Sequence, residues 1–210
     1  MVLRLVTGKY KGKVLSSSDT AKELRPTQAI VREAIINTFK SLFLSENIDP
    51  YSSFEDIEIL DLYSGSGSMG YEFLSTGVKK VNFVDYDPKC LKLLKTNMLA
   101  MNLVDKVEIY RGELPRILKK VAARKKNQID LVFFDPPFKI TVENYIETLK
   151  AILMSEVLKP NGLLLMEYKN KELETQLLEG FLEELTIVKT KNYGDCFIVI
   201  AQKIALKNNQ

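Results

Sequence analysis

The chain has 210 residues, of which 46% are hydrophobic and 27% charged, a composition typical of a globular protein that builds its core without disulfides or metal. Because it contains no histidine, Ser-His-Asp and Cys-His catalysis are excluded. The two cysteines, Cys90 and Cys196, lack the spacing of a zinc site, so we expect no metal and two reduced thiols packed as small apolar groups. No apolar run is long enough to span a bilayer and no signal-peptide pattern opens the chain, so we expect a cytoplasmic protein.

The net charge is only +3, but it is unevenly distributed. Between residues 1 and 40, eight Lys and Arg residues stand against three acidic ones. A second basic cluster contains Arg116, Lys119, Lys120, Arg124, Lys125 and Lys126. Such clusters indicate a polyanionic partner, although a solvated helix face is an equally good interpretation of the second one.

The first part of the chain predicts a small extension. Short strands over residues 3–6 and 14–15 flank a glycine-rich turn, and a polar loop follows. Pro26 then starts an amphipathic helix that ends near residue 45, because apolar side chains recur there at helical spacing. We therefore expect residues 1–48 to form an N-terminal extension and residues 49–210 to form the main domain.

From residue 57 onward, strand and helix patterns alternate. The expected strands cover residues 57–62, 80–84, 107–110, 129–134, 163–168, 185–189 and 196–201, and the expected helices cover residues 68–75, 88–101, 114–123, 142–153 and 173–180. Continuous apolar strands separated by helices predict a parallel sheet covered on both faces. The last two strands have only a short connection, so this pair is antiparallel. The pattern predicts an α/β fold of the Rossmann-like, class I S-adenosylmethionine-dependent methyltransferase type, with seven strands.

A glycine-rich turn follows the first of these strands. Residues 65–70 read Gly-Ser-Gly-Ser-Met-Gly, which matches GxGxxG, a pattern that nicotinamide enzymes also use. Asp61 and Asp85 end successive strands, where one carboxylate can meet an amino group and the other the ribose hydroxyls, although loop or helix-capping acids are the alternative. Carboxylates at these two strand ends suit the amino group and the ribose of S-adenosylmethionine. The candidate cofactor-binding residues are Asp61, Tyr63, Ser64, Gly65, Gly67, Gly70, Asp85, Tyr86, Gly112 and Glu113, of which Glu113 could instead be a first-turn acid.

The run Asp135-Pro136-Pro137-Phe138 follows the fourth strand, at the sheet edge where ligands bind in open α/β folds. An exocyclic amine is a poor nucleophile because its lone pair is delocalised into the base. The Asp135 carboxylate and the Pro136 carbonyl can accept its hydrogens, Pro137 stiffens the turn, and Phe138 can stack on an extruded base. A rigid loop with a capping aspartate is the alternative. The pattern favours methylation of a nucleic-acid base amine.

Several segments resemble the RsmD family, bacterial enzymes that methylate guanine N2 in 16S ribosomal RNA. The resemblance lies in residues 8–13, in Arg25-Pro26-Thr27 with the following Val-Arg-Glu at 31–33, in residues 61–67, in the Asp-Pro-Pro-Phe run, and in residues 191–194. It implies S-adenosylmethionine as cofactor and 16S rRNA as partner, in a small ribosomal subunit or an assembly intermediate. It also implies that the basic N-terminal residues Arg4, Lys9, Lys11, Lys13 and Arg32 hold RNA phosphates, and that the RNA-contacting Arg25 and Thr27 lie beside the active site.

Other functions remain open at this point. An adenine-N6 methyltransferase acting on DNA or RNA would use the same amine chemistry, but the chain has no room for a separate target-recognition domain. A non-catalytic RNA-binding assembly factor would keep the fold without the activity. A nicotinamide oxidoreductase would need neither the Asp-Pro-Pro-Phe run nor the terminal strand pair. We expect a monomeric rRNA guanine-N2 methyltransferase.

Overall fold

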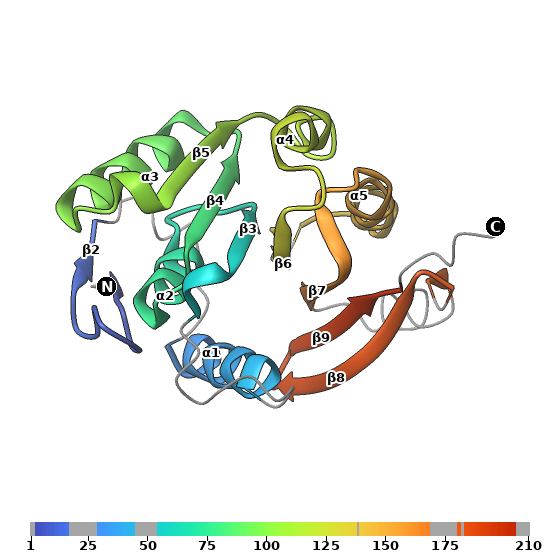
Figure 1. The fold of residues 1–210 in the computed structure, drawn as a ribbon, viewed down its shortest axis with the longest axis horizontal. Helices are drawn as coiled ribbons and strands as arrows, with labels where there is room; N and C mark the ends of the chain where they lie inside the picture. Colours follow the sequence, from blue (N-terminus) through green and yellow to red (C-terminus); the bar gives the residue numbers. More distant parts are fainter. Residues whose placement is uncertain are drawn as a thin grey trace. The chain divides into compact units, whose positions relative to one another are not determined.

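The computed structural model describes residues 3–16, 29–44, 54–137, 139–168, 180–181 and 183–204. The chain divides into two compact units, Met1–Arg111 and Gly112–Gln210 (Figure 1). The division between these units lies between residues 111 and 112, whereas the expected domain boundary follows residue 48. The expected division into an N-terminal extension and a main domain stays a prediction. No helix among the described residues is long and apolar enough to cross a membrane.

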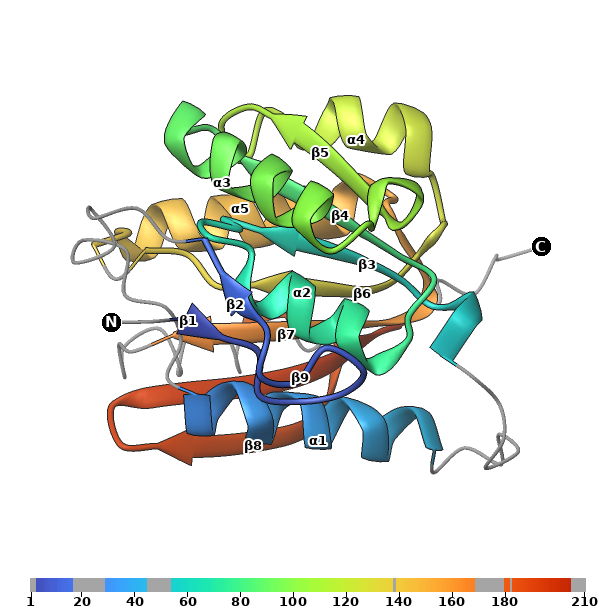
Figure 2. The same ribbon diagram turned by 90° about the vertical axis from the view of Figure 1, so that its left-hand side faces the viewer.

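The described residues of the first unit form a hairpin, three α-helices and three parallel strands. Its elements are β1 (Leu3–Arg4), β2 (Val14–Leu15), α1 (Ala29–Leu44), η2 (Phe54–Asp56), β3 (Glu58–Leu62), α2 (Ser68–Thr76), β4 (Lys80–Asp85), α3 (Pro88–Ala100), η3 (Val104–Lys106) and β5 (Val107–Arg111). β1 and β2 pair antiparallel, whereas β4 pairs parallel with both β3 and β5. The hairpin lies beside α2 (Figure 2). All five residues of β3 are buried, as expected for a strand covered on both faces.

Local sequence explains how the helices of this unit begin and end. α2 lies between Gly67 and Gly77, which both adopt the left-handed conformation that favours glycine. Asp87 caps α3 by accepting a hydrogen bond from the Lys89 amide (2.8 Å), and Pro88 occupies the first helical position. α1 packs against α2 through Phe39 and Phe73, whose ring centroids are 5.2 Å apart. The expected helix start at Pro26 lies outside the described residues.

The second unit contains α4 (Leu118–Lys125), β6 (Ile129–Phe134), α5 (Val142–Met154), β7 (Leu158–Tyr168), β8 (Leu185–Tyr193) and β9 (Cys196–Lys203). β6 and β7 are parallel, whereas β9 runs antiparallel to β7 and β8. β8 and β9 form a long curved hairpin (Figures 1 and 2). The strand order of the main sheet is β5-β4-β3-β6-β7-β9-β8. The predicted seven-stranded, mostly parallel sheet with an antiparallel last strand is therefore confirmed.

Three element boundaries in the second unit differ from expectation. α4 begins at Leu118 rather than at residue 114, because residues 114–117 form turns in which the Leu118 amide bonds to the Pro115 carbonyl (3.1 Å). β7 starts five residues early, since its register shifts beside Ile129 and Leu131 and lets the Pro-Asn-Gly segment at 160–162 stay in the strand. β8 extends to Tyr193, so only residues 194–195 separate it from β9. The expected helix over 173–180 falls almost wholly outside the described residues.

Candidate active site

The glycine-rich turn adopts a left-handed backbone conformation that favours glycine. Gly65 and Gly67 have φ angles of 54° and 78°. A Cβ atom on Gly67 would lie 2.5 Å from the Leu94 side chain, so the turn is packed tightly as well as left-handed. The Gly67 amide donates to the Ser64 carbonyl at 2.7 Å, which closes the turn. The tight packing and this hydrogen bond hold the backbone of the turn in place.

Asp61 is attached to the first turn of α2. Its Oδ2 accepts a hydrogen bond from the Gly70 amide at 3.0 Å, and the side chain is only 2% exposed. A Cβ atom on Gly70 would lie 2.1 Å from the Phe83 ring and 2.8 Å from Asp61 Oδ2. The third glycine of the pattern is therefore required so that the helix can approach the strands and the carboxylate.

Asp85 ends β4 and holds the other side of the loop. Its Oδ2 accepts from the Gly65 amide (2.8 Å) and its Oδ1 accepts from the Asp87 amide (2.9 Å). Ser64 joins the ends of β3 and β4, because its hydroxyl donates to the Asp61 carbonyl (2.7 Å) and accepts from the Val84 amide (2.9 Å). These bonds place the glycine turn between two carboxylates.

Burial changes the acid strength of both carboxyl groups. Desolvation raises the pKa of Asp61 to about 8, although the Gly70 hydrogen bond opposes the shift and the nearby Asp85 charge adds to it. Desolvation likewise raises the pKa of Asp85, against the hydrogen bonds from the Asp87 and Gly65 amides. Two desolvated carboxylates near one another favour a cationic ligand. S-adenosylmethionine, which carries a sulfonium and an ammonium group, fits this set.

The remaining candidate cofactor residues differ in exposure. Tyr63 has a φ of 55°, which is unusual for a residue other than glycine, and it is half-buried. Tyr86 directly follows Asp85 and is 61% exposed, so its ring is open to a planar ligand. Gly112 and Glu113 belong to the second unit. A Cβ atom on Gly112 would lie 2.6 Å from the Ile117 side chain, whereas Glu113 is exposed.

In the second unit, the Asp-Pro-Pro run directly follows β6. Asp135 is half-buried, Pro136 is buried, and the Pro137 carbonyl accepts from the Ile140 amide at 2.8 Å, which closes a turn. Tyr145 lies close enough to Asp135 for the charge of the aspartate to affect its pKa. Burial raises the pKa of Tyr145 well above its ordinary value, and the charges of Tyr168 and Asp135 raise it further. Phe138 lies outside the described residues.

Sequence reasoning missed a second acid at this edge. Phe134 pairs with Met166 in the parallel β6–β7 register, and Glu167 follows Met166 as Asp135 follows Phe134. Glu167 is buried and accepts from the Cys196 thiol at 3.0 Å. A lone acid at the end of an apolar strand is the signal that could have identified it.

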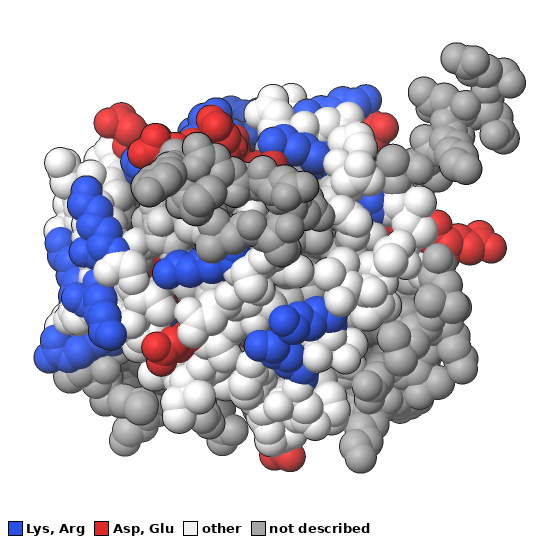
Figure 3. Space-filling view, turned by 60° about the horizontal axis from the view of Figure 1, so that its bottom comes forward, with Lys and Arg blue, Asp and Glu red and all other residues white. Residues whose placement is uncertain are grey.

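The basic residues of the N-terminal hairpin lie at the surface. Arg4, Lys9, Lys11 and Lys13 are all exposed. Arg4 Nη1 donates to the Gly12 carbonyl (3.1 Å), and Lys13 Nζ donates to the Ala100 carbonyl (2.8 Å). Exposed Lys and Arg side chains are also visible on the face drawn in Figure 3. Arg25 and Thr27 lie outside the described residues.

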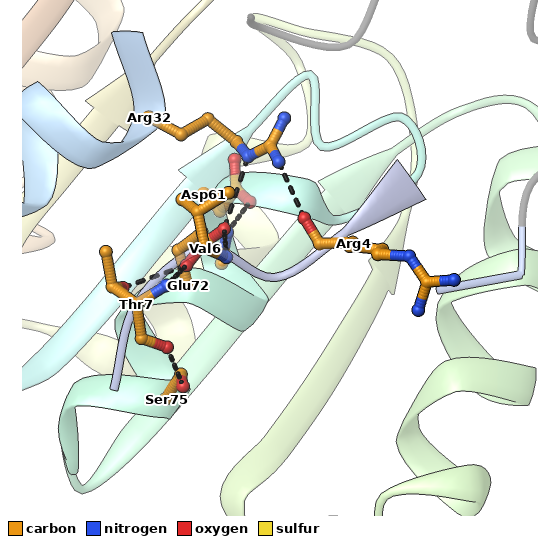
Figure 4. A network of polar contacts seen from close by, with 8 residues as sticks. Arg4, Val6, Thr7, Arg32, Asp61, Glu72 and Ser75 are labelled. Atoms are coloured by element: carbon orange, nitrogen blue, oxygen red, sulfur yellow. Dashed lines mark hydrogen bonds and ion pairs between the residues drawn. The ribbon is translucent and has the colours of Figure 1, made fainter. Parts of the chain in front are cut away.

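Arg32 contradicts the expectation that it contacts RNA. Its side chain is only 4% exposed, and Nε lies 3.3 Å from Glu72 Oε1. Its Nη2 donates to the Arg4 carbonyl at 2.7 Å (Figure 4). The sequence places Arg32 among surface cations because charge patterning cannot tell a solvated cation from one that neutralises a buried acid. Glu72, the partner, was missed, although it is the single charge in the otherwise uncharged segment 68–76.

A glycine turn between carboxylates at two strand ends, in a sheet whose last strand runs antiparallel, defines the class I S-adenosylmethionine-dependent methyltransferases. Solved structures share this fold: a Haemophilus influenzae methylase superposes with a TM-score of 0.70, at 26% identity, over 98% of this chain and all of that one. The chain belongs to the family described as Conserved hypothetical protein 95, whose model matches residues 3–202. The predicted membership of the RsmD family is thereby confirmed.

Curated relatives extend over nearly the full chain. YlbH of Bacillus subtilis, which is named as an rRNA methyltransferase, is 29% identical over 202 residues, covering 96% of this chain and 99% of YlbH. Ribosomal RNA small subunit methyltransferase D of Haemophilus influenzae is 29% identical over 194 residues, covering 91% and 89%. The similarity therefore includes both units.

Proposed function

We propose that this protein transfers a methyl group from S-adenosylmethionine to the exocyclic N2 amine of a guanine in small-subunit ribosomal RNA. The observation that carries the proposal is the Asp-Pro-Pro run directly after β6, in a chain whose relatives are named for rRNA methylation. The choice of guanine N2 rests on the RsmD family. The same geometry would serve another base amine, which is why the product nucleoside has to be identified.

Residues of the first unit, together with Gly112 and Glu113, hold the cofactor in this proposal. The Asp61 carboxylate meets the cationic amino-acid part, and the Asp85 carboxylate accepts hydrogen bonds from the ribose hydroxyls. Both keep acceptor sites beyond their present amide donors, since an ionised carboxylate offers about four lone-pair sites. The exposed Tyr86 ring packs against the adenine, and Gly112 with Glu113 contacts its edge. When bound, S-adenosylmethionine supplies an electrophilic methyl group on sulfur.

Residues of the second unit orient the nucleophile. The Asp135 carboxylate and the Pro136 carbonyl accept the two hydrogens of the amine, which draws its lone pair out of conjugation with the base. Pro137 restricts the backbone so that the Pro136 carbonyl keeps its direction. Phe138 stacks on the base. The protein therefore accelerates the transfer mainly by positioning and by two fixed acceptors.

The exposed cations of the hairpin, Arg4, Lys9, Lys11 and Lys13, bind RNA phosphates, and Arg25 and Thr27 lie beside the target nucleotide. Phosphate contacts set register without reading sequence, so they are suited to a substrate recognised by its folded shape. We propose that the enzyme acts as a monomer on a small ribosomal subunit or an assembly intermediate.

The test is transfer of labelled methyl from S-adenosylmethionine to small ribosomal subunits purified from cells that lack this protein. We expect label in N2-methylguanosine after digestion to nucleosides. The Asp135→Ala variant, which removes one of the two acceptors for the amine, serves as the control and should transfer far less. Label in N6-methyladenosine would identify a different base amine and overturn the guanine assignment. Cofactor binding without any transfer would support an assembly factor.

A further inference from the structure

Glu72 is a fully buried carboxylate in the middle of α2, and the structure surrounds it with donors. Oε1 accepts from the Val6 amide at 2.8 Å, and Oε2 accepts from the Thr7 amide at 3.1 Å and the Thr7 hydroxyl at 2.9 Å. Arg32 completes the set as the ion-pair partner (Figure 4). Three of the four bonds come from the loop that continues the β1 strand of the basic hairpin.

A second contact fixes the same hairpin one turn further along α2. The Lys9 amide donates to the Ser75 carbonyl at 2.7 Å, and the Tyr10 amide donates to the Ser75 hydroxyl at 2.8 Å. The Ser75 hydroxyl in turn donates to the Thr7 carbonyl. Gly8 makes this approach possible, because a Cβ atom there would lie 1.9 Å from the Ser75 carbonyl oxygen. Residues 6–10 therefore lie along one face of α2.

α2 is also the helix that follows the glycine turn. Gly70, whose amide binds Asp61, lies only two residues before Glu72. The hairpin and the cofactor loop are consequently held by the same rigid helix, within one compact unit. A cation on the hairpin therefore has a fixed position relative to Asp61, whereas an undocked hairpin would not keep one.

We propose that Glu72 is the positioning residue that docks the basic hairpin, so that its cations bind RNA at a fixed distance from the methyl donor. The assignment rests on the proposed function for the nature of the substrate. Glu72 touches neither RNA nor cofactor. Arg32 serves the same purpose by neutralising Glu72 and by holding the Arg4 carbonyl.

Two glycines of the same hairpin provide a matched test. Gly8 and Gly12 both have left-handed φ angles, of 67° and 85°, but an added Cβ strikes α2 only at Gly8 and meets nothing within 4 Å at Gly12. Gly8→Ala should raise the KM for small-subunit RNA by about tenfold or more, because phosphate contacts are lost. The Kd for S-adenosylmethionine and kcat should stay within about twofold to threefold. Gly12→Ala, which introduces the same left-handed strain without the clash against α2, should raise the KM for RNA much less than Gly8→Ala. Equal effects of the two substitutions would overturn the proposal, as would a parallel loss of cofactor affinity.

A graded pair of variants tests Glu72 itself. Thr7→Val removes only the hydroxyl that donates to Oε2, and should raise the KM for RNA a few-fold. Glu72→Gln, which removes the charge opposite Arg32, should raise it more. Circular dichroism verifies that each variant is folded. If Glu72→Gln is folded and its KM for RNA is unchanged, the positioning role is wrong.

Hydrogen exchange separates failure of this proposal from failure of the proposed function, since it needs no substrate. The Val6 and Thr7 amides should exchange faster in Gly8→Ala and Glu72→Gln than in the wild type and Gly12→Ala. Unchanged protection would refute the docking whatever the enzyme methylates. If protection is lost as expected but the wild type transfers no methyl to small-subunit RNA, the docking stands and the proposed function fails.

Discussion

Asp61 and Glu72 are two buried carboxylates of the same unit, and they differ in how many protein groups bind them. Glu72 receives four protein hydrogen bonds or ion pairs, including that of Arg32. Asp61 has one amide donor, from Gly70, and its pKa rises to about 8 because burial outweighs that bond. A buried carboxylate whose oxygens accept several hydrogen bonds from the protein stabilises the fold. A buried carboxylate with a single amide donor is suited to a cationic ligand.

The largest expected effect comes from removing the Glu72 carboxylate. Glu72→Ala leaves the Arg32 guanidinium, the Val6 and Thr7 amides and the Thr7 hydroxyl without their acceptor, at a position where the carboxylate is fully buried. Breaking a buried ion pair in this way costs about 3–5 kcal/mol of unfolding free energy. Urea unfolding at pH 7 measures it. A loss below about 1 kcal/mol would show that the pair is weaker than its burial implies.

Asp135→Ala should have the largest effect on the rate of methyl transfer, in contrast to substitutions of Asp61 or Glu72. Without its acceptor the amine stays conjugated, and kcat should fall by about 100-fold or more, as when one preorganised partner of a transition state is lost. The Kd for S-adenosylmethionine should change less than about twofold, since the proposed cofactor contacts are elsewhere. Single-turnover methyl transfer and isothermal titration give the two numbers. Activity that survives within a few-fold would remove Asp135 from the amine-orienting role.

Asp85→Ala should weaken cofactor binding by about 1.5–3 kcal/mol, the range for hydrogen bonds that involve a charged group. The loss includes loosening of the glycine turn, because the Gly65 amide loses its acceptor. Asp87→Ala is the control, since Asp87 caps α3 and lies outside the proposed ribose contact. If both variants bind S-adenosylmethionine equally well, Asp85 does not hold the ribose.

The comparison also shows what a sequence can predict. The strand and helix sequence, the glycine turn and the acids at strand ends followed from periodicity and turn chemistry, which are local. Glu72 and Arg32 did not, because their pairing joins residues 40 apart through packing of α1 on α2. Arg32 carries the same charge as Lys11 and was expected to have the same role, yet Arg32 neutralises a buried acid and Lys11 lies exposed. The late start of α4 and the early start of β7 depended on turn geometry and a register shift, which composition does not reveal.

The smallest effect per measured step, at most about 1.4 kcal/mol per pH unit, is the pH dependence that Asp61 imposes on stability. Its pKa is about 8 in the folded protein against an ordinary value of 3.8, so between these values the folded state holds a proton that the unfolded state has released. Stability should therefore fall as pH rises from about 4 to about 8, with a slope of at most about 1.4 kcal/mol per pH unit from this group.

Asp61→Asn keeps an acceptor for the Gly70 amide and cannot ionise, so its stability curve should be flatter. Subtracting the two urea-unfolding curves between pH 5 and 8 gives the contribution of Asp61 together with its coupling to Asp85, because the charges of the two carboxyl groups interact. Cofactor affinity of the wild type should rise over the same interval, since the cation favours the ionised carboxylate, and the Asn variant should lose that rise. Parallel stability curves would mean that Asp61 is ionised in the free protein. Protein groups would then stabilise the Asp61 carboxylate, as they do the Glu72 carboxylate.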